Sequence, residues 1–374
     1  MAGITVATEN VVKQWDSKYF TEYVRGNLFS PYMGTSENSA IQINEKLGKL
    51  PGDAITCSLI GKLSGAGVGA GALEGNEEAL GNYGHAINIA VKRNAVLIDN
   101  FDQQQTAVDL RNAAKTQLMN WSMDNLRGDI IEALHSRNSG TSVNTNYGSA
   151  AAGLHDSWNA DNVDRVHYVG LSTPSGGHTA DLAGLATTDV ASASAVSLCR
   201  RMARTADPHI RPIRVNGSEE WFVMFADPYL FRDLRDDSTI NNAQRDAWQR
   251  GANNPLFRAG DIIYDGVIIR EIPEIASYID DAAGTWGAGA TADSLKTAGT
   301  TSNRIGVAFM CGAQAVGVAW GKRTKSTTDV RDYGFLNGVG VEEFRGVEKL
   351  CYQSTTTNRC DHGVVTLYAA AATD

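Results

Sequence analysis

The segment Ile55-Thr-Cys-Ser-Leu-Ile-Gly-Lys-Leu63 alternates apolar and polar residues, which is typical of a β-strand with one apolar face. A second alternating run starts at Ile87 and continues into Ala95-Val-Leu-Ile98. Between the two runs lies Ser64-Gly-Ala-Gly-Val-Gly-Ala-Gly-Ala-Leu-Glu-Gly-Asn-Glu-Glu-Ala-Leu-Gly81, which is too flexible and polar to hold a core. Together the three parts predict a long β-hairpin with a loose tip over residues 53–99.

A hairpin of this kind needs a partner. Two strands alone are marginally stable in water, and their unpaired edges attract other chains. We therefore expect the tip to contact a neighbouring subunit through six residues: Leu73, Glu74, Gly75, Asn76, Glu77 and Glu78. Within one subunit these carboxylates should be solvated, whereas in an interface they can meet Arg or Lys.

A long helix is predicted over residues 106–135. Thr106 is expected to open it, with Asp109 three residues later in a capping-box-like arrangement. The apolar stripe that follows at helical spacing consists of Leu110, Ala114, Leu118, Trp121, Met123, Leu126, Ile130 and Leu134. About 30 residues at 1.5 Å each form a rod of roughly 45 Å.

The other segments mix helical and strand patterns without a regular β-α-β repeat, which predicts an α+β fold. Residues 10–25 are predicted to be helical, and 27–52 to form an arm rather than part of a core. Residues 138–190 are predicted to be a long loop with at most a strand at Val166–Leu171. The remaining predictions are a helix at 190–205, strands near 209–215 and 219–226, a helix from Asp227, a hairpin at 261–272 turning at Asp265-Gly266, an insertion at 281–303, and two or three β segments over 341–371.

Composition argues against several classes of protein. The net charge of −9 disfavours strong DNA binding, because a protein that grips phosphates needs a basic face. No signal peptide is predicted from the first ten residues. The most apolar stretch, Ile305–Trp320, falls short of the roughly 20 residues that span a bilayer; it is predicted to be a buried strand, a turn and a short helix, so no membrane contact is expected. The five scattered cysteines predict free thiols.

No motif predicts a catalytic, cofactor-binding or metal-binding residue. Gly65-Ala-Gly-Val-Gly-Ala-Gly71 lacks the Gly-Lys-Ser/Thr ending of a phosphate-binding loop, and carboxylates follow it. The seven histidines lack metal-ligand spacing. The adjacent pairs His155-Asp156 and Asp361-His362 are predicted to be surface pairs. The charge run from Arg232 to Asp237 is predicted to be a solvated helix face, with a salt-bridged interface as the alternative.

Several strings resemble the major capsid proteins of tailed bacteriophages, especially the group named after coliphage N-four. The resemblance runs in order from about residue 53 to about 321, and the rest of the chain lies outside it. The strings are Leu63-Ser-Gly-Ala-Gly-Val68, Leu73-Glu-Gly-Asn-Glu-Glu-Ala-Leu80, Asp109-Leu-Arg111 with Ala114-Lys115 and Trp121, Ile210-Arg-Pro-Ile-Arg-Val215, Phe222 to Arg235, Asn254-Pro-Leu-Phe257, Asp265-Gly-Val-Ile268 and Gly312-Ala-Gln-Ala315.

This resemblance implies the Hong Kong 97-type capsid fold. The implied parts are an N-terminal arm (1–52), an extended β-hairpin loop (53–99), a peripheral domain (100–165) with a long spine helix (106–135), an axial domain (166–340), and a tail (341–374) that returns to the peripheral domain. The hairpin and the rod found from periodicity fall where this fold has its extended loop and its spine helix.

The implied function is a coat protein that assembles as hexamers and pentamers into an icosahedral shell around double-stranded DNA. It would be assembled in the bacterial cytoplasm and reside in the virion, contacting DNA weakly and non-specifically. Portal, scaffold and decoration proteins are candidate partners, and neither a cofactor nor a membrane is implied. Two alternatives remain: an encapsulin-like nanocompartment, which shares the fold and encloses cargo enzymes, and a cytoplasmic enzyme of unknown reaction.

Overall fold

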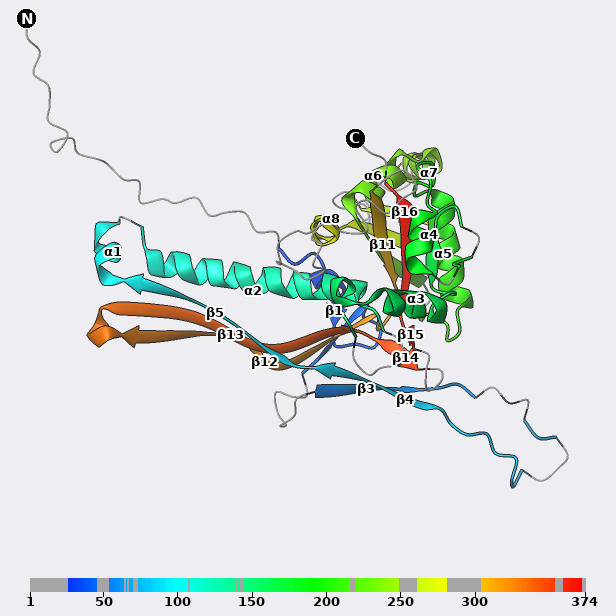
Figure 1. Cartoon of the computed structure of the whole chain (residues 1–374), viewed down its shortest axis with the longest axis horizontal. Helices are drawn as coiled ribbons and strands as arrows, with labels where there is room; N and C mark the ends of the chain where they lie inside the picture. The colour runs from blue at the N-terminus through cyan, green and yellow to red at the C-terminus, as the bar shows by residue number, and fades with distance from the viewer. Residues whose placement is uncertain are drawn as a thin grey trace, which may run out of the picture.

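A computed structural model shows an elongated α+β chain with three parts (Figure 1). A compact lobe carries a long tongue of strands and one helix on one side, and a two-stranded hairpin projects away from the tongue on the other. The described residues are 26–45, 54–248, 261–280, 304–353 and 359–371, with short gaps at 64, 66, 70–72, 107, 139, 141–143, 172, 176 and 216–218. The predicted helix at 10–25 and the insertion at 281–303 lie outside them.

The tongue is built on a five-stranded sheet with the order β1-β2-β12-β13-β5. Its strands are β1 (Met33–Gly34), β2 (Ile41–Asn44), β12 (Val316–Arg331), β13 (Leu336–Lys349) and β5 (Ala90–Asp99). β12 and β13 are antiparallel partners over almost their whole length, whereas β2 pairs only with residues 316–319 of β12. Beyond residue 319 the tongue is therefore a three-stranded ribbon.

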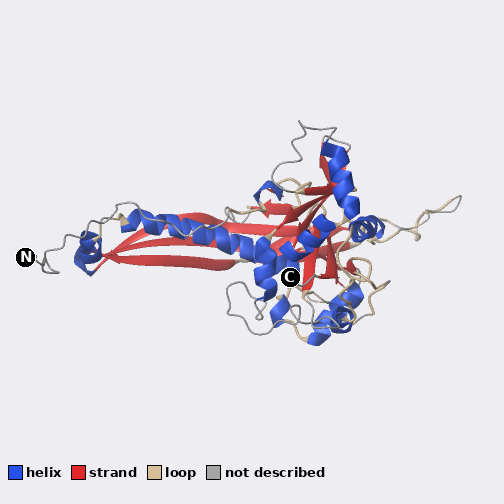
Figure 2. Cartoon of the chain, turned by 90° about the horizontal axis from the view of Figure 1, so that it is seen from above, coloured by secondary structure: helices blue, strands red, loops and turns tan. Residues whose placement is uncertain are grey.

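Helix α2 (Leu110–His135) runs along one face of this ribbon (Figure 2). Leu118 packs there against Val339 and Val341 of β13. The helix starts at Leu110 rather than at Thr106, because Asp109 accepts hydrogen bonds from the backbone N–H groups of the first turn at 3.1 Å. Thr106 instead ends a separate short helix, α1 (Asn100–Gln105), where the chain reverses at the end of the tongue.

The compact lobe contains a second sheet with the order β6-β16-β11-β8-β10-β9, with β7 beside β8. Its strands are β6 (Val166–Tyr168), β7 (Ile213–Val215), β8 (Glu219–Ala226), β9 (Ile262–Tyr264), β10 (Val267–Glu271), β11 (Ile305–Cys311) and β16 (Val364–Ala370). Its helices are α3 (Ala152–Asp161), α4 (His178–Ala183), α5 (Ala193–Thr205), α6 (Pro228–Asp236), α7 (Ser238–Trp248) and α8 (Pro273–Asp280). Both faces of the sheet are covered, because alternate residues of β8 belong to two different buried clusters.

The hairpin consists of β3 (Ala54–Ile60) and β4 (Asn82–Asn88), paired antiparallel. At its root Ile55 and Ile87 are buried with Ala319 and Leu350. The predicted strand over residues 90–98 is present as β5, but its assignment to the hairpin is wrong, since β5 pairs with β13 and only β4 pairs with β3. Residues 90–99 therefore belong to the sheet of the tongue, where β13 is their hydrogen-bonded partner.

Several local predictions in the compact lobe are confirmed. Asp227 caps α6, accepting a hydrogen bond from the Tyr229 N–H at 2.8 Å. β9 and β10 form the predicted hairpin, with Asp265 at φ 46° and Gly266 at φ 71° in the turn. This left-handed pair is the conformation that an Asp-Gly turn favours between two strands.

The predicted loop at 138–190 is corrected, because it contains helices α3 and α4, whereas the strand predicted at Val166–Leu171 is present as β6. Trp158 of α3 is fully buried under the guanidinium of Arg137, which lies 3.7 Å above the ring centre. Asp181 of α4 accepts a hydrogen bond from the Asn159 side chain at 2.8 Å. Such contacts between distant residues stabilise short helices that sequence periodicity does not show.

Three further predictions differ from the structure. Residues after Val316 form strand β12 rather than a short helix, because β13 pairs with them. Residues 27–44 are partly core: Phe29 is fully buried with its ring 4.8 Å from that of Phe225. The boundary at 340/341 divides β13, and in the tail β13 lies under α2 whereas β16 joins the compact sheet.

All five cysteines are free thiols, with Cys57 half-buried and the others buried. Burial raises the pKa of Cys199 to about 12 and that of Cys360 to about 11. Protonated thiols oxidise slowly, so we expect a thiol count under denaturant to find five reactive groups per chain. A disulfide between Cys351 and Cys360 would contradict this prediction.

Among the described residues, none of the helices has the length and apolar character needed to cross a membrane.

Candidate assembly surfaces

All six predicted contact residues at the tip of the hairpin are exposed. Its turn is held locally: the Asn76 N–H donates to the Leu73 carbonyl at 3.0 Å, and the Gly75 N–H donates to the Glu77 carboxylate at 2.8 Å. The Glu78 carboxylate accepts from the Gly65 N–H across the loop, also at 2.8 Å. The tip thus presents three carboxylates together with the exposed side chain of Leu73.

Polar contacts fix the hairpin to the body of the subunit near its root. The His85 ring lies 3.1 Å from the Glu348 carboxylate of β13, and both side chains are largely buried. Glu348 also accepts a hydrogen bond from the Asn88 N–H at 3.3 Å. Farther out, Lys62 makes an exposed ion pair with Asp207 at 3.2 Å. The root is therefore positioned by buried contacts, whereas the outer half has weak support within the chain.

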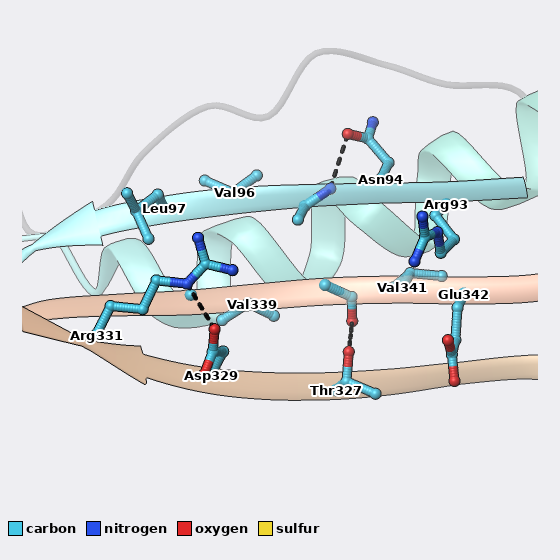
Figure 3. A pocket seen from close by; sticks show the side chains of 13 residues that line it. Arg93, Asn94, Val96, Leu97, Thr327, Asp329, Arg331, Val339, Val341 and Glu342 are labelled. Carbon is cyan, nitrogen blue, oxygen red and sulfur yellow. Dashed lines mark hydrogen bonds and ion pairs between the residues drawn. The ribbon is translucent and has the colours of Figure 1, made fainter.

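A groove of about 610 Å³ lies on the tongue across strands β5, β13 and β12 (Figure 3). Strand register places three rows of side chains on this face, opposite the face that α2 covers. These rows are Arg93–Glu342–Lys325, Ala95–Gly340–Thr327 and Leu97–Gly338–Asp329. Leu97 is 54% exposed on the groove wall, so the groove offers an apolar surface as well as charges.

The two carboxylates on this face, Glu342 and Asp329, each lie beside a cation. A hydrogen bond from Lys322 lowers the pKa of Glu342, and one from Arg331 lowers the pKa of Asp329. Both carboxylates therefore remain ionised, each beside its own cation. The charges of Lys325 and Arg93 also act on Glu342 and lower its pKa further. The lining of the groove carries two arginines, Arg93 and Arg331, and two carboxylates, Asp329 and Glu342.

The end of the tongue carries a second exposed patch. Tyr333 is fully solvent-exposed, and its backbone has φ 49°, a value that residues other than glycine rarely adopt. Phe101 and Phe335 beside it are 58% and 47% exposed. Exposed aromatic groups of this kind are typical of surfaces that contact other proteins.

The histidines and acidic residues considered from the sequence do not form a metal-binding cluster among the described residues. In the described ranges there is no cluster of His, Cys, Asp or Glu that could hold a metal ion. The two His-Asp pairs are not surface pairs, contrary to prediction: Asp361 is buried, and the His155 ring stacks on that of His178 at 5.3 Å. Burial lowers the pKa of His155 to about 4, so it is neutral near pH 7. These groups hold the junction of tongue and lobe together.

The sequence predicted a contact at the hairpin tip, which stays a prediction, but gave no indication of the groove. The last part of Ile305–Trp320 was predicted to be a short helix, so the long strand β12 was not recognised. The available signal was the alternation Gly338-Val-Gly-Val341, which places small residues on one face of a strand and apolar ones on the other.

An α+β chain with a helix-backed tongue, a projecting hairpin and, among its described residues, no metal-binding cluster has the architecture of a capsid subunit of Hong Kong 97 type. The chain belongs to the phage capsid protein family, whose model matches residues 3–373. It is thus a structural protein of the virion and not an enzyme.

Known relatives agree with this assignment. The chain is 35% identical to a chain described as "Cyanophage Pam1 capsid asymmetric unit", with a TM-score of 0.88 and full coverage of both chains. It is 27% identical to the major capsid protein of Pseudomonas phage KPP25, over 96% of this chain and 94% of that protein. The capsid of Ralstonia phage GP4 shares the fold at 22% identity, with a TM-score of 0.71 over 100% of this chain and 99% of that one. The predicted fold class is confirmed, and the family favours a capsid over the encapsulin-like and enzyme alternatives.

Proposed function

We propose that copies of this chain assemble as hexamers and pentamers into an icosahedral shell around double-stranded DNA. The observation that carries the proposal is the hairpin, which is anchored at its root by buried residues while Ile60, Leu63 and Leu73 farther out are 61–66% exposed. An apolar strand pair with this little cover within its own subunit is expected to be covered by another subunit. Assembly would take place in the host cytoplasm.

We further propose a role in the capsid for each part of the subunit. The tongue with α2 would serve as the peripheral domain, the compact lobe as the axial domain, and the tip residues 73–78 as an inter-subunit contact. The net charge of −9 supports weak, non-specific contact with packaged DNA, because like charges limit binding to phosphates. Portal, scaffold and decoration proteins would be the other partners.

The purified native product should be a closed shell of megadalton mass. Because the exposed hairpin and tongue repeat in every subunit, many weak contacts add up to a stable assembly. Light scattering after size exclusion, together with negative-stain microscopy, measures this directly. A single species near the monomer mass of 40.0 kDa under all assembly conditions, with the hairpin ordered, would refute the proposal.

A further inference from the structure

Two histidine rings are stacked in the buried junction between the tongue and the compact lobe. The His155 ring of α3 and the His178 ring of α4 are nearly parallel, with their centres 5.3 Å apart. Two hydroxyl groups also hold the His178 ring, that of Tyr168 at 2.7 Å from Nδ1 and that of Tyr147 at 3.3 Å from Nε2. The stacked pair therefore joins α3 and α4 to strand β6 and to the segment that follows α2.

A buried arginine lies against this pair at the C-terminal end of α2. Arg137 is fully buried, and its Nε donates a hydrogen bond to Nδ1 of His155 at 3.4 Å. Its Nη2 donates to the Tyr368 hydroxyl of β16 at 2.5 Å, and the Trp158 ring of α3 lies beneath the guanidinium. Because arginine stays charged and can only donate, these contacts require the Nδ1 atom of His155 to be an unprotonated acceptor.

The surrounding charges keep both rings neutral. The other titratable groups near the pair are Asp156, Asp181, the buried ring of His135, and the ion pair of Lys349 with Asp361. The Asp156 charge favours protonation of His155, but burial and the Arg137 charge outweigh it and lower the pKa of His155 to about 4. Burial and the Arg137 charge also hold the pKa of His178 well below its usual range.

These shifts make the closed junction sensitive to acid. Above pH 6.5, the ordinary pKa of histidine, the rings are neutral whether the junction is closed or open. Between pH 6.5 and about 4 a ring released into water binds a proton, whereas the buried His155 ring does not. Acid therefore favours the open form, by up to about tenfold in the equilibrium constant per pH unit for each ring.

We propose that the stacked rings of His155 and His178 form an acid-sensitive latch, and that proton uptake by this pair releases α3 and α4 from the end of α2. A proton on Nδ1 of His155 would turn the acceptor of the Arg137 hydrogen bond into a donor and place two cations together in a buried site. The ribbon of β5, β12 and β13 contains no histidine, so it should stay folded. The latch acts within one subunit and goes beyond the proposed assembly into shells.

Hydrogen exchange with mass spectrometry tests the latch on unassembled subunits at pH 7.5 and pH 4.5, after correction for the intrinsic exchange rates. Peptides within residues 152–183 should lose protection by about tenfold or more at pH 4.5. Peptides from β5 and β13 should keep theirs. Unchanged protection of 152–183 in acid, or an equal loss along the whole chain, would overturn the proposal.

A double variant assigns the effect to the two rings. His155→Phe keeps an aromatic ring beside Tyr147, and His178→Gln keeps one donor and one acceptor for the tyrosine hydroxyls. Together they should preserve the protection of 152–183 at pH 4.5. The matched control, His209→Gln, removes an exposed histidine that contacts the Ala206 carbonyl, and it should open in acid like the wild type.

A single variant covers the case in which the double variant does not fold at pH 7.5. His155→Phe changes only a half-buried position and should retain part of the protection that the wild type loses in acid. Acid opening of this variant equal to that of the wild type would overturn the latch. Because every measurement uses single subunits, a failure here leaves the proposed function intact, and a failure to form shells at pH 7.5 leaves the latch intact.

Discussion

Asp361→Asn is expected to lower the free energy of unfolding of the unassembled subunit by about 3–5 kcal/mol, because it leaves a buried cation without its counter-ion. The Lys349 ammonium lies 2.8 Å from the Asp361 carboxylate, and the two side chains are 0% and 2% exposed. Urea unfolding followed by tryptophan fluorescence measures the change.

The position of this ion pair explains the size of the effect. Lys349 also donates to the Ser136 carbonyl at the end of α2, at 2.8 Å. Asp361 accepts a hydrogen bond from the Trp158 indole at 3.3 Å, and its carbonyl accepts one from the Arg165 guanidinium at 3.1 Å. The pair therefore joins the tongue, α3 and the tail in one buried network. Loss of the carboxylate charge strains contacts in all three parts.

A double variant separates the charge from the packing. Lys349→Met with Asp361→Leu removes both charges while keeping apolar bulk, and such replacements of buried pairs are often neutral. It should recover most of the stability that Asp361→Asn loses. A loss below about 1 kcal/mol for Asp361→Asn would show that solvent reaches the pair, as in surface ion pairs.

Local chemistry made several elements predictable. The alternation in residues 55–63 indicated β3, and Asp265-Gly266 indicated the turn between β9 and β10. The helix over 110–135 followed from spacing, although its start was placed one turn early because Asp109, rather than Thr106, provides the cap. In each case the signal lies within about ten neighbouring residues.

Other elements depend on contacts between distant residues. From sequence alone β5 resembles a continuation of the hairpin, because its partner strand β13 lies 237 to 255 positions farther along the chain. Helix α3 has weak periodicity and is held by the burial of Trp158 beneath Arg137. The tip was predictable because its glycines and carboxylates are adjacent in sequence, whereas the groove is not, since three distant strands form it.

The second large effect concerns assembly. Within the subunit the tip carboxylates of Glu77 and Glu78 are exposed and accept hydrogen bonds from the Gly75 and Gly65 N–H groups. Solvated contacts of this kind contribute little to stability, about 0–1 kcal/mol. In an interface, truncating one partner of a desolvated charge pair costs about 2–5 kcal/mol. A shell repeats each contact many times, so a modest loss per contact is enough to prevent closure.

Glu77→Lys combined with Glu78→Lys is therefore expected to leave the melting temperature of unassembled subunits nearly unchanged and to abolish or mis-size the shells. Calorimetry and negative-stain microscopy measure the two effects. Glu77→Gln with Glu78→Gln keeps acceptors for the two backbone N–H groups while removing the charge, so an equal defect assigns the effect to electrostatics. Asp236→Lys with Glu271→Lys makes the same charge change at exposed positions of the compact lobe and should assemble normally. Normal shells from the reversed tip, or subunits that no longer fold, would show that the tip is not an inter-subunit contact.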